Sequence, residues 1–514
     1  MNGAELALRS ATSAGVEVCF ANPGTTEMEL VDAVDRVSGL RAVLGLFEGV
    51  VTGAADGYGR VTGRPALTLL HLGPGFANGI ANLHNARRAR TPVVNLIGDH
   101  ASWHVGADAP LTSDIVSLAT PVSKHVATVP AAARAGTTVL EAVATATSPP
   151  TGVATVIVPQ DAAWGRAGLH DATAAEPTTF EPDPEAVAEA AARLRQGPAA
   201  VLLVGGVVRR AELESAARIR AATGCRVRLD TFPAVLEQGR GLPRFDNVPY
   251  FPEQAVDALA DVETVVTAGT REPVAFFGYE NLGRSRLLPE GCMVTSVAPA
   301  GVRGHVGLDA LAAELDLDDA PATVDEPDAP VVPTGDLDVM TLGATLAAIQ
   351  PEGAIVVNES ATSGLGWAVS APGAPPHEVF SLTGGAIGQG LPNAVGAAVA
   401  APDRKVIALQ ADGSGLYTVQ SLWTMARESL DVTVVVCANQ VYRILQMEMH
   451  RTGHDDAGPE ARALLDLHDP APDWVALARG FGVEAVKAGT VGELRAGIEQ
   501  GLATEGPFLV EALL

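Results

Sequence analysis

The sequence predicts an α/β fold of three domains, each a doubly wound parallel sheet with helices on both faces. Three observations support this prediction. Apolar runs such as 66–70, 199–204 and 406–409 alternate with segments of helical length, Gly-rich turns follow several of these runs, and two polar segments interrupt the pattern. Continuous apolar strands that alternate with helices are typical of parallel sheets that are buried on both faces. A length of 514 residues also favours about three domains.

The two polar segments give the predicted domain boundaries. One covers residues 171–184 and the other 315–336, and both contain several prolines and lack periodicity. Such segments are typical of connections between domains. We therefore expect an N-terminal domain over 1–170, a central domain over 185–315 and a C-terminal domain over 337–514.

The N-terminal and C-terminal domains repeat one another. When the sequence is shifted by 340 positions, 64–70 lies over 404–410, 73–75 over 413–415 and 92–94 over 432–434, without a gap. Each copy consists of an apolar strand, a Gly-rich turn, a helix and a second apolar strand. Two ordinary α/β units could converge on this pattern, but the length of the gapless agreement favours an internal duplication.

The central domain shows the same alternation, with strands expected near 199–206, 225–229 and 263–269. No G-x-G-x-x-G motif opens a helix there, so the sequence gives little support for a dinucleotide site.

The composition excludes several classes of function. The formal net charge is −26, whereas nucleic acids and anionic membranes are bound by basic patches. The sequence contains no run of about eighteen apolar residues, so no membrane span is expected, and the first residues lack the pattern of a signal peptide. The four cysteines are far apart and fit no metal-binding spacing. We interpret them as buried free thiols of a protein in a reducing cytosol. We therefore expect a cytoplasmic protein that binds neither nucleic acid nor membranes.

The strongest chemical signal is a pair of strand ends in the C-terminal domain. Asp412, Gly413 and Ser414 follow one apolar strand, and Asn439 closes the next strand after a single helix. Adjacent parallel strands bring such residues to one sheet edge, where open α/β sheets bind ligands. Carboxylate and amide oxygens suit Mg²⁺, and the N–H groups of a Gly-rich helix start suit a diphosphate. A surface turn and an Asn cap are the structural alternative, but the spacing favours a Mg²⁺–diphosphate site.

Other polar groups could complete this site. The Tyr442 hydroxyl could donate to a phosphate, and the Val441 carbonyl could be a third metal ligand. Ser360 and Thr362 follow another strand and offer hydroxyls to the same phosphate.

Three residues of the N-terminal domain are candidates for acid–base chemistry or substrate binding. Glu48 lies where an apolar strand meets a helix, so desolvation could suit it to proton exchange, or it could only interact with the helix dipole. His71 ends the strand of the first repeat and could move protons or be a structural histidine. Thr25 could donate to a substrate carboxylate, although a threonine in a turn needs no function.

A Gly-rich loop over 383–392 could lie against a flat ligand. Its glycines permit a close approach of the backbone, and Ile387 is a stiff side chain that could pack against a ring.

Together these motifs resemble the thiamine diphosphate-dependent enzymes of the acetolactate synthase and benzoylformate decarboxylase group. The Glu48 segment, the Gly-rich loop and the Asp-Gly-Ser … Asn spacing follow the order of that family over nearly the whole chain. The resemblance implies a pyrimidine-binding N-terminal domain, a central domain and a diphosphate-binding C-terminal domain. It implies thiamine diphosphate and Mg²⁺ as cofactors, with Asp412, Asn439 and the Val441 carbonyl as metal ligands, and a homodimer or homotetramer with the site between subunits.

The resemblance also implies roles for individual residues. Glu48 would protonate the aminopyrimidine ring, Ile387 would support the bent cofactor, and the Gly385 carbonyl would accept from the cofactor's amino group. His71 and Thr25 match positions at which benzoylformate decarboxylase carries a site histidine and a serine.

Some positions depart from the family patterns. Leu111 falls where acetolactate synthases usually have glutamine, which argues against classical acetolactate formation. Phe276 falls roughly where benzoylformate decarboxylase has a second site histidine. The central domain lacks the Gly-Met-His-Gly stretch of flavin-containing members, so we expect no FAD.

The sequence thus predicts a thiamine diphosphate- and Mg²⁺-dependent lyase or transferase whose partner is a small-molecule 2-oxo acid. Decarboxylation would be followed by release of an aldehyde or by ligation to a second carbonyl, with His71 transferring protons and Thr25 orienting the substrate. One alternative is a catalytically silent homologue that binds the cofactor as a subunit of another enzyme. Another is a nucleotide-dependent oxidoreductase, which the missing G-x-G-x-x-G motif disfavours.

Overall fold

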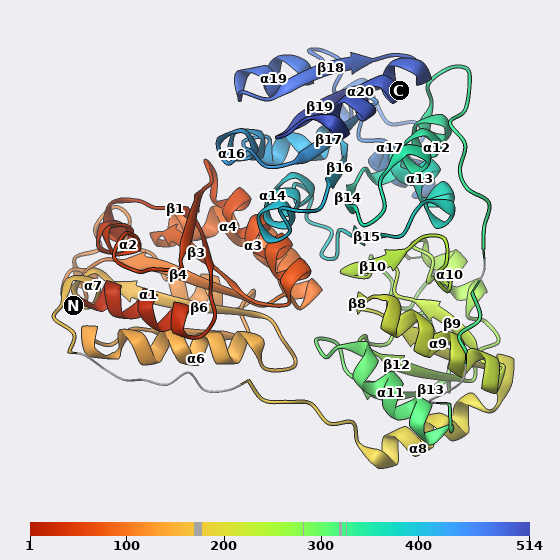
Figure 1. The fold of residues 1–514 in the computed structure, drawn as a ribbon, viewed down its shortest axis with the longest axis horizontal. Helices are drawn as coiled ribbons and strands as arrows, with labels where there is room; N and C mark the ends of the chain where they lie inside the picture. Colours follow the sequence, from red (N-terminus) through yellow and green to blue (C-terminus); the bar gives the residue numbers. More distant parts are fainter. Residues whose placement is uncertain (169–176, 281, 318–320, 325) are drawn as a thin grey trace.

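The computed structural model describes residues 1–168, 177–280, 282–317, 321–324 and 326–514. Figure 1 shows an N-terminal part in red and orange, a middle part in yellow and green, and a C-terminal part in teal and blue. The predicted α/β fold class is confirmed, with three sheets in which parallel pairing dominates. Residues 171–176 of the first predicted connection, and 318–320 and 325 of the second, lie outside the described ranges.

The N-terminal sheet has six strands in the order β2-β1-β3-β4-β6-β5, and all pairs are parallel. The strands are β1 (Val18–Asn22), β2 (Arg41–Leu44), β3 (Ala66–His71), β4 (Val93–Asp99), β5 (His125–Thr128) and β6 (Val153–Pro159). Its helices are α1 (Gly3–Ser13), α2 (Met28–Val34), α3 (Glu48–Thr62), α4 (Leu72–Ala89), α5 (Ile115–Ala119), α6 (Ala135–Thr147) and α7 (Gln160–Trp164). Successive residues of β3 enter different cores, with Leu69 packing on the α1 and α6 side and Leu70 on the α3 and α4 side.

The C-terminal sheet has the strand order β18-β19-β17-β16-β14-β15-β10-β8. The C-terminal part contributes β14 (Ile355–Glu359), β15 (His377–Phe380), β16 (Val406–Ala411), β17 (Val432–Ala438), β18 (Glu484–Ala488) and β19 (Phe508–Leu513). Read from β15 to β18, this order matches the N-terminal sheet strand for strand, and β16 is β3 shifted by 340 positions, in agreement with the internal repeat. Its helices are α12 (Val339–Ile349), α13 (Leu365–Ser370), α14 (Gly390–Ala400), α15 (Asp412–Gly415), α16 (Ser421–Arg427), α17 (Arg443–Arg451), α18 (Pro459–Ala463), α19 (Trp474–Gly480) and α20 (Val491–Ala503).

The middle part is divided between two sheets. A five-stranded parallel sheet contains β7 (Ala200–Val204), β9 (Arg226–Leu229), β11 (Asp246–Asn247), β12 (Thr264–Ala268) and β13 (Met293–Ala298). Its helices are α8 (Pro184–Leu194), α9 (Arg210–Thr223), α10 (Pro252–Ala258) and α11 (Gly304–Glu314). The remaining strands, β8 (Val207–Val208) and β10 (Val235–Gln238), extend the C-terminal sheet, where β10 pairs antiparallel with β15. The middle and C-terminal parts therefore share hydrogen-bonded backbone.

Helices α3 and α14 join the N-terminal and C-terminal parts. A Cβ on Gly396 would lie 1.9 Å from the Ala54 carbonyl oxygen, so the helices approach more closely than larger side chains would allow. The Asn393 side chain donates to the Gly53 carbonyl over 2.9 Å, and these residues occupy equivalent positions of the two repeats, 340 apart. The contact therefore holds the first turns of these two helices against each other. No helix of the described ranges is long and apolar enough to cross a membrane.

Candidate active site

The centre of the candidate site is the edge formed by the carboxyl ends of β16 and β17. The two strands pair in parallel with Ala411 opposite Cys437, so the following residues leave the sheet side by side. The Asp412 carboxylate accepts from the Gly413 N–H over 2.7 Å and from the Gln440 N–H over 2.6 Å. This second bond links the two turns, and it places Asp412 beside the segment that carries Asn439.

The environment of Asp412 fits a bound divalent cation. The side chain is buried, and burial raises the pKa of its carboxyl above the ordinary value while backbone N–H groups oppose that shift. Within the described chain no lysine or arginine forms an ion pair with it. A cation would therefore offset the desolvation of this carboxylate. The neighbouring Asn439 side chain supplies an amide oxygen that accepts from the Val441 N–H over 3.0 Å, so the donor set is hard oxygen, as Mg²⁺ prefers.

Residues around this centre pack tightly. A Cβ on Gly413 would lie 2.5 Å from Cε1 of Tyr442, so the tyrosine ring lies directly against the glycine and no side chain fits there. The Ser414 hydroxyl lies 2.6 Å from the Gln410 amide nitrogen, which donates to it, and 3.2 Å from the Ala411 carbonyl. Four predicted residues therefore form one cluster on α15 and the loop before α17, with Asp412 at its base.

The end of β14 lies next to this cluster. The Ser360 side chain is buried and donates to the Asn358 side-chain oxygen over 2.6 Å, whereas Thr362 is partly exposed. Ser363 was not predicted, yet its hydroxyl lies 3.4 Å from the Asn439 amide nitrogen. The β14 end thus offers hydroxyls near the predicted metal ligands, with Ser363 the one that contacts them.

A buried carboxylate that the sequence analysis missed holds the Gly-rich loop. Glu359 accepts from the N–H groups of Gly388 at 2.6 Å, Gln389 at 3.2 Å and Gly390 at 2.7 Å. It also accepts from the Gln410 side chain over 3.0 Å. Burial raises the pKa of the Glu359 carboxyl, and these donors counteract the shift. The last residue of β14 therefore fixes the start of α14 and the loop before it.

The N-terminal part holds the same loop from the other side. Asn85 on α4 accepts from the Ala386 N–H over 3.2 Å and donates to the Ala386 carbonyl over 2.7 Å. Asn82, one turn earlier, donates to the Gly388 carbonyl over 3.2 Å. These bonds leave the partly exposed Ile387 between two anchored residues.

Gly385 lies at the exposed tip of this loop. Its φ of +75° favours glycine, and a Cβ there would lie 3.3 Å from Cε1 of Phe276. The middle part therefore also reaches the loop, through the ring of Phe276.

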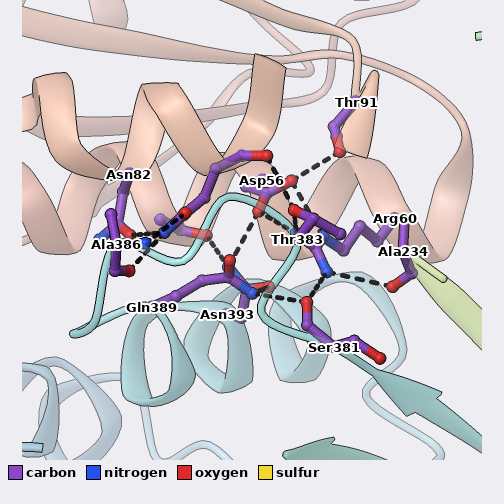
Figure 2. A network of polar contacts seen from close by, with 12 residues as sticks. Asp56, Arg60, Asn82, Thr91, Ala234, Ser381, Thr383, Ala386, Gln389 and Asn393 are labelled. Carbon is purple, nitrogen blue, oxygen red and sulfur yellow. Dashed lines mark hydrogen bonds and ion pairs between the residues drawn. The ribbon is translucent and has the colours of Figure 1, made fainter. Parts of the chain in front are cut away.

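An ion pair fixes the strand that precedes the loop (Figure 2). Arg60 and Asp56 are almost fully buried, and Nε and one Nη of the Arg60 guanidinium donate to the two Asp56 carboxylate oxygens, at 3.0 and 2.8 Å. Arg60 also donates to the Ser381 carbonyl over 2.7 Å, to the Ala234 carbonyl over 3.1 Å and to the Thr383 hydroxyl over 3.1 Å. One arginine thus connects the N-terminal, middle and C-terminal parts.

Glu48 begins α3 and is partly buried. Its carboxylate accepts from the Asn78 side chain over 3.0 Å, and a Cβ on Gly75 would lie 3.1 Å from its Oε1. Through the repeat offset of 340 positions, Glu48 corresponds to Gly388, two residues before α14 begins in the C-terminal part.

His71 ends β3 and contacts residues of the turn after β1. Its Nδ1 lies 2.8 Å from Glu27 Oε2 and 3.1 Å from the Thr26 hydroxyl. The predicted Thr25 is exposed at the start of this turn, η1 (Thr25–Glu27). The hydrogen-bond partners of His71 in this turn are therefore the two residues after Thr25, and neither of them was predicted.

The predicted residues form two groups within one chain. The C-terminal group contains Asp412 and Asn439, and the N-terminal group contains Glu48, His71 and Thr25. No hydrogen bond joins the two groups directly in the described ranges; α4, α14 and the Gly-rich loop lie between them.

Comparisons with known proteins identify relatives over the whole length of this chain. The profile described as "Thiamine pyrophosphate enzyme, N-terminal TPP binding domain" matches residues 1–118, and its C-terminal counterpart matches residues 363–512. A Mycobacterium tuberculosis protein provisionally named acetolactate synthase large subunit IlvX is 47% identical over 520 residues, which cover 100% of this chain and 99% of that protein. Benzoylformate decarboxylase of Pseudomonas aeruginosa is 29% identical over 97% of this chain and 96% of its own length. The solved structure of the Rhodococcus jostii RHA1 thiamine diphosphate-dependent 4-hydroxybenzoylformate decarboxylase has a TM-score of 0.86 and 25% identity, and covers 99% of this chain and 98% of its own.

Proposed function

The chain belongs to the thiamine pyrophosphate enzyme family, and from this premise we propose that it binds thiamine diphosphate with Mg²⁺ and decarboxylates a 2-oxo acid. The observation that carries the proposal is the buried Asp412 carboxylate, which has no cationic side-chain partner in the described chain and lies one strand from Asn439. Asp412, Asn439 and the Val441 carbonyl are the proposed metal ligands. The N–H groups at the start of α15 and the hydroxyls near Ser360 and Ser363 would face the diphosphate.

Thiamine diphosphate, when bound, supplies an electron sink for the electron pair that decarboxylation leaves behind. The chain's own residues bind, orient and exchange protons. With the cofactor bound, Glu48 would exchange a proton with the aminopyrimidine ring, the Gly385 carbonyl would accept from the amino group of that ring, and Ile387 would support the cofactor. His71 transfers a proton to or from the reacting substrate, and Thr25 orients the substrate carboxylate.

The relatives named above include a decarboxylase and a protein named as a synthase, and the proposed residues serve both reactions. Release of an aldehyde and ligation to a second carbonyl share the loss of CO₂ and differ only in what happens afterwards. We therefore propose only the step that both reactions share, which is the release of CO₂ from a 2-oxo acid.

We further propose that the working unit is a homodimer or homotetramer. Among the described residues of one chain, no hydrogen bond joins the two groups of predicted residues. A second copy would bring the N-terminal group of one subunit to the C-terminal group of its partner. The site would then lie between subunits.

Calorimetry tests the cofactor assignment. Wild-type protein titrated with thiamine diphosphate in the presence of Mg²⁺ should bind it, and Asp412→Ala should lose most of the affinity because a metal ligand is missing. Binding to wild type would then be followed by an assay of CO₂ release from a panel of 2-oxo acids. Folded wild-type protein that binds no cofactor would refute the assignment. Binding without turnover of any 2-oxo acid would favour a catalytically silent homologue.

A further inference from the structure

A buried carboxylate beside His71 has no role in the reaction proposed above. Glu27 ends η1, and its side chain is fully buried, whereas the side chain of His71 is 21% exposed. In the described part of the chain, His71 is its only ion-pair partner. We propose that Glu27 is a positioning residue that holds His71 in one tautomer and presents its Nε2 for proton transfer. The proton-transfer role of His71 rests on the proposed function, whereas the contact that fixes its tautomer does not.

Three groups surround the Glu27 carboxylate. Oε2 accepts from the Gly24 N–H over 2.8 Å and lies 2.8 Å from His71 Nδ1. Oε1 accepts from the Thr26 hydroxyl over 2.5 Å. Both oxygens are therefore satisfied, and the imidazole provides one of the three contacts.

The position of one hydroxyl proton decides the histidine tautomer. Thr26 has a single O–H, and it donates that proton to Glu27 Oε1. The same oxygen lies 3.1 Å from His71 Nδ1, so in this contact the nitrogen must be the donor. Nδ1 therefore carries a proton, which it donates to both Glu27 Oε2 and the Thr26 hydroxyl oxygen. In the neutral ring this leaves Nε2 without a proton, as an acceptor.

The sheet leaves space for this arrangement. His71 pairs in register with Gly98 on β4, and a Cβ on Gly98 would lie 1.8 Å from Glu27 Oε1. Any other residue at position 98 would therefore displace the carboxylate. The turn after β1 and the ends of β3 and β4 together form a pocket for the Glu27 side chain.

The arrangement suits a group that delivers a proton repeatedly. When CO₂ leaves a 2-oxo acid, the C–C bond electrons stay on the former keto carbon, and one proton must be added there to give an aldehyde. His71 would supply that proton from Nε2 and regain one from solvent, so that overall one proton from water is consumed. Glu27 stabilises the charged ring before the transfer and fixes its orientation throughout, as buried carboxylates do for catalytic histidines.

Nuclear magnetic resonance tests the geometry without any turnover. Wild-type protein labelled with ¹⁵N-histidine is examined at mildly alkaline pH, and His71→Gln identifies the signals of this ring. We expect Nδ1 to carry the proton in wild type and the tautomer mixture to change in Glu27→Gln. A wild-type ring protonated at Nε2, or a His71 signal that does not depend on residue 27, would overturn the proposal whether or not the chain is an enzyme.

Kinetics test the positioning role, with benzoylformate and pyruvate as probes. Glu27→Gln should lower kcat by at least about 10- to 100-fold, the loss typical when a group that orients a metal-binding histidine is removed. Glu27→Gln combined with His71→Ala should be no slower than His71→Ala alone, because Glu27 acts through His71. The matched control is Glu212→Gln. Glu212 is another fully buried carboxylate, it contacts His305 Nδ1 at 3.1 Å in the middle part, and its loss should leave kcat unchanged.

The outcomes separate the two claims. Multiplicative losses in the double variant, or equal losses in the Glu27 and Glu212 variants, would show that Glu27 has only a structural role. If wild type releases no CO₂ from any 2-oxo acid, the proposed function fails, and the tautomer measurement alone decides whether Glu27 positions His71.

Discussion

Glu48 begins α3 at the edge of the N-terminal sheet, and two functions fit that position. It could exchange protons with the cofactor, or it could only stabilise the helix start. Glu48→Gln should lower turnover by about 10²–10⁴-fold, because a group that exchanges a proton in the reaction contributes that much. The measurement is the rate of CO₂ release, with thermal unfolding as the check on folding.

The control for this prediction is Glu185→Gln, since Glu185 is an acid in the first turn of α8. If Glu48 served only the helix dipole, both substitutions would cost about 0.3–1 kcal/mol of stability and leave turnover intact. Near-full activity of Glu48→Gln would remove this residue from the mechanism.

His377 makes stability depend on pH. The ring is buried beside Trp367, donates from Nδ1 to the Pro375 carbonyl, and burial lowers its pKa from 6.5 to about 4. The unfolded chain therefore takes up a proton that the folded protein resists. The free energy of unfolding should fall as the pH decreases from about 6.5 to about 4, by about 3 kcal/mol from this group.

Urea unfolding at a series of pH values measures this effect. His377→Asn keeps a donor for the Pro375 carbonyl but cannot titrate, so its curve should be flatter in that pH range. His450→Asn, which alters an exposed histidine paired with Asp455, should leave the curve unchanged. A wild-type slope that persists in His377→Asn would assign it to other groups.

At the scale of elements, the Asp56–Arg60 pair holds α3 against the strand before the Gly-rich loop (Figure 2). Arg60→Met would leave the Asp56 carboxylate buried without its cation, and we expect a loss of about 3–5 kcal/mol in the free energy of unfolding. Denaturant unfolding measures this loss. Arg64→Met breaks an exposed pair with Glu17, so it should cost less than about 1 kcal/mol. Equal losses would mean that burial does not determine the strength of the Arg60 pair.

Some elements could be predicted from the sequence and others could not. The strand β16 and the helix start at Asp412 were predicted because an apolar run ends in Asp-Gly-Ser, a local pattern. The short strands β8 and β10 gave no such signal, and their pairing with the C-terminal sheet depends on β15, which lies far along the chain. Glu359 was visible in the sequence as a strand-end acid, but the three N–H groups that it binds lie about 30 residues later.

At the scale of the whole molecule, mixed subunits test whether the site lies between chains. Glu48→Gln and Asp412→Ala each damage one group of residues, and each homodimer should be nearly inactive. In a hybrid dimer with the site between subunits, one site carries both substitutions and the other carries neither. Co-expression in equal amounts should therefore restore about a quarter of wild-type activity. A site within one chain would give no recovery.

The α/β class, the repeat and the strand-end residues Asp412, Asn439 and His71 could all be predicted from the amino-acid sequence. Each of these depends on local periodicity or on spacing over one helix, and both signals can be recognised in one sequence before the fold is known. The contacts that hold the site in place became visible only in the folded chain. Arg60 bonds to a carbonyl 321 positions away, Asn85 to one 301 away, and His71 to a carboxylate 44 away. Such contacts follow from how helices and sheets pack together, and no pattern along the chain records which distant groups will meet.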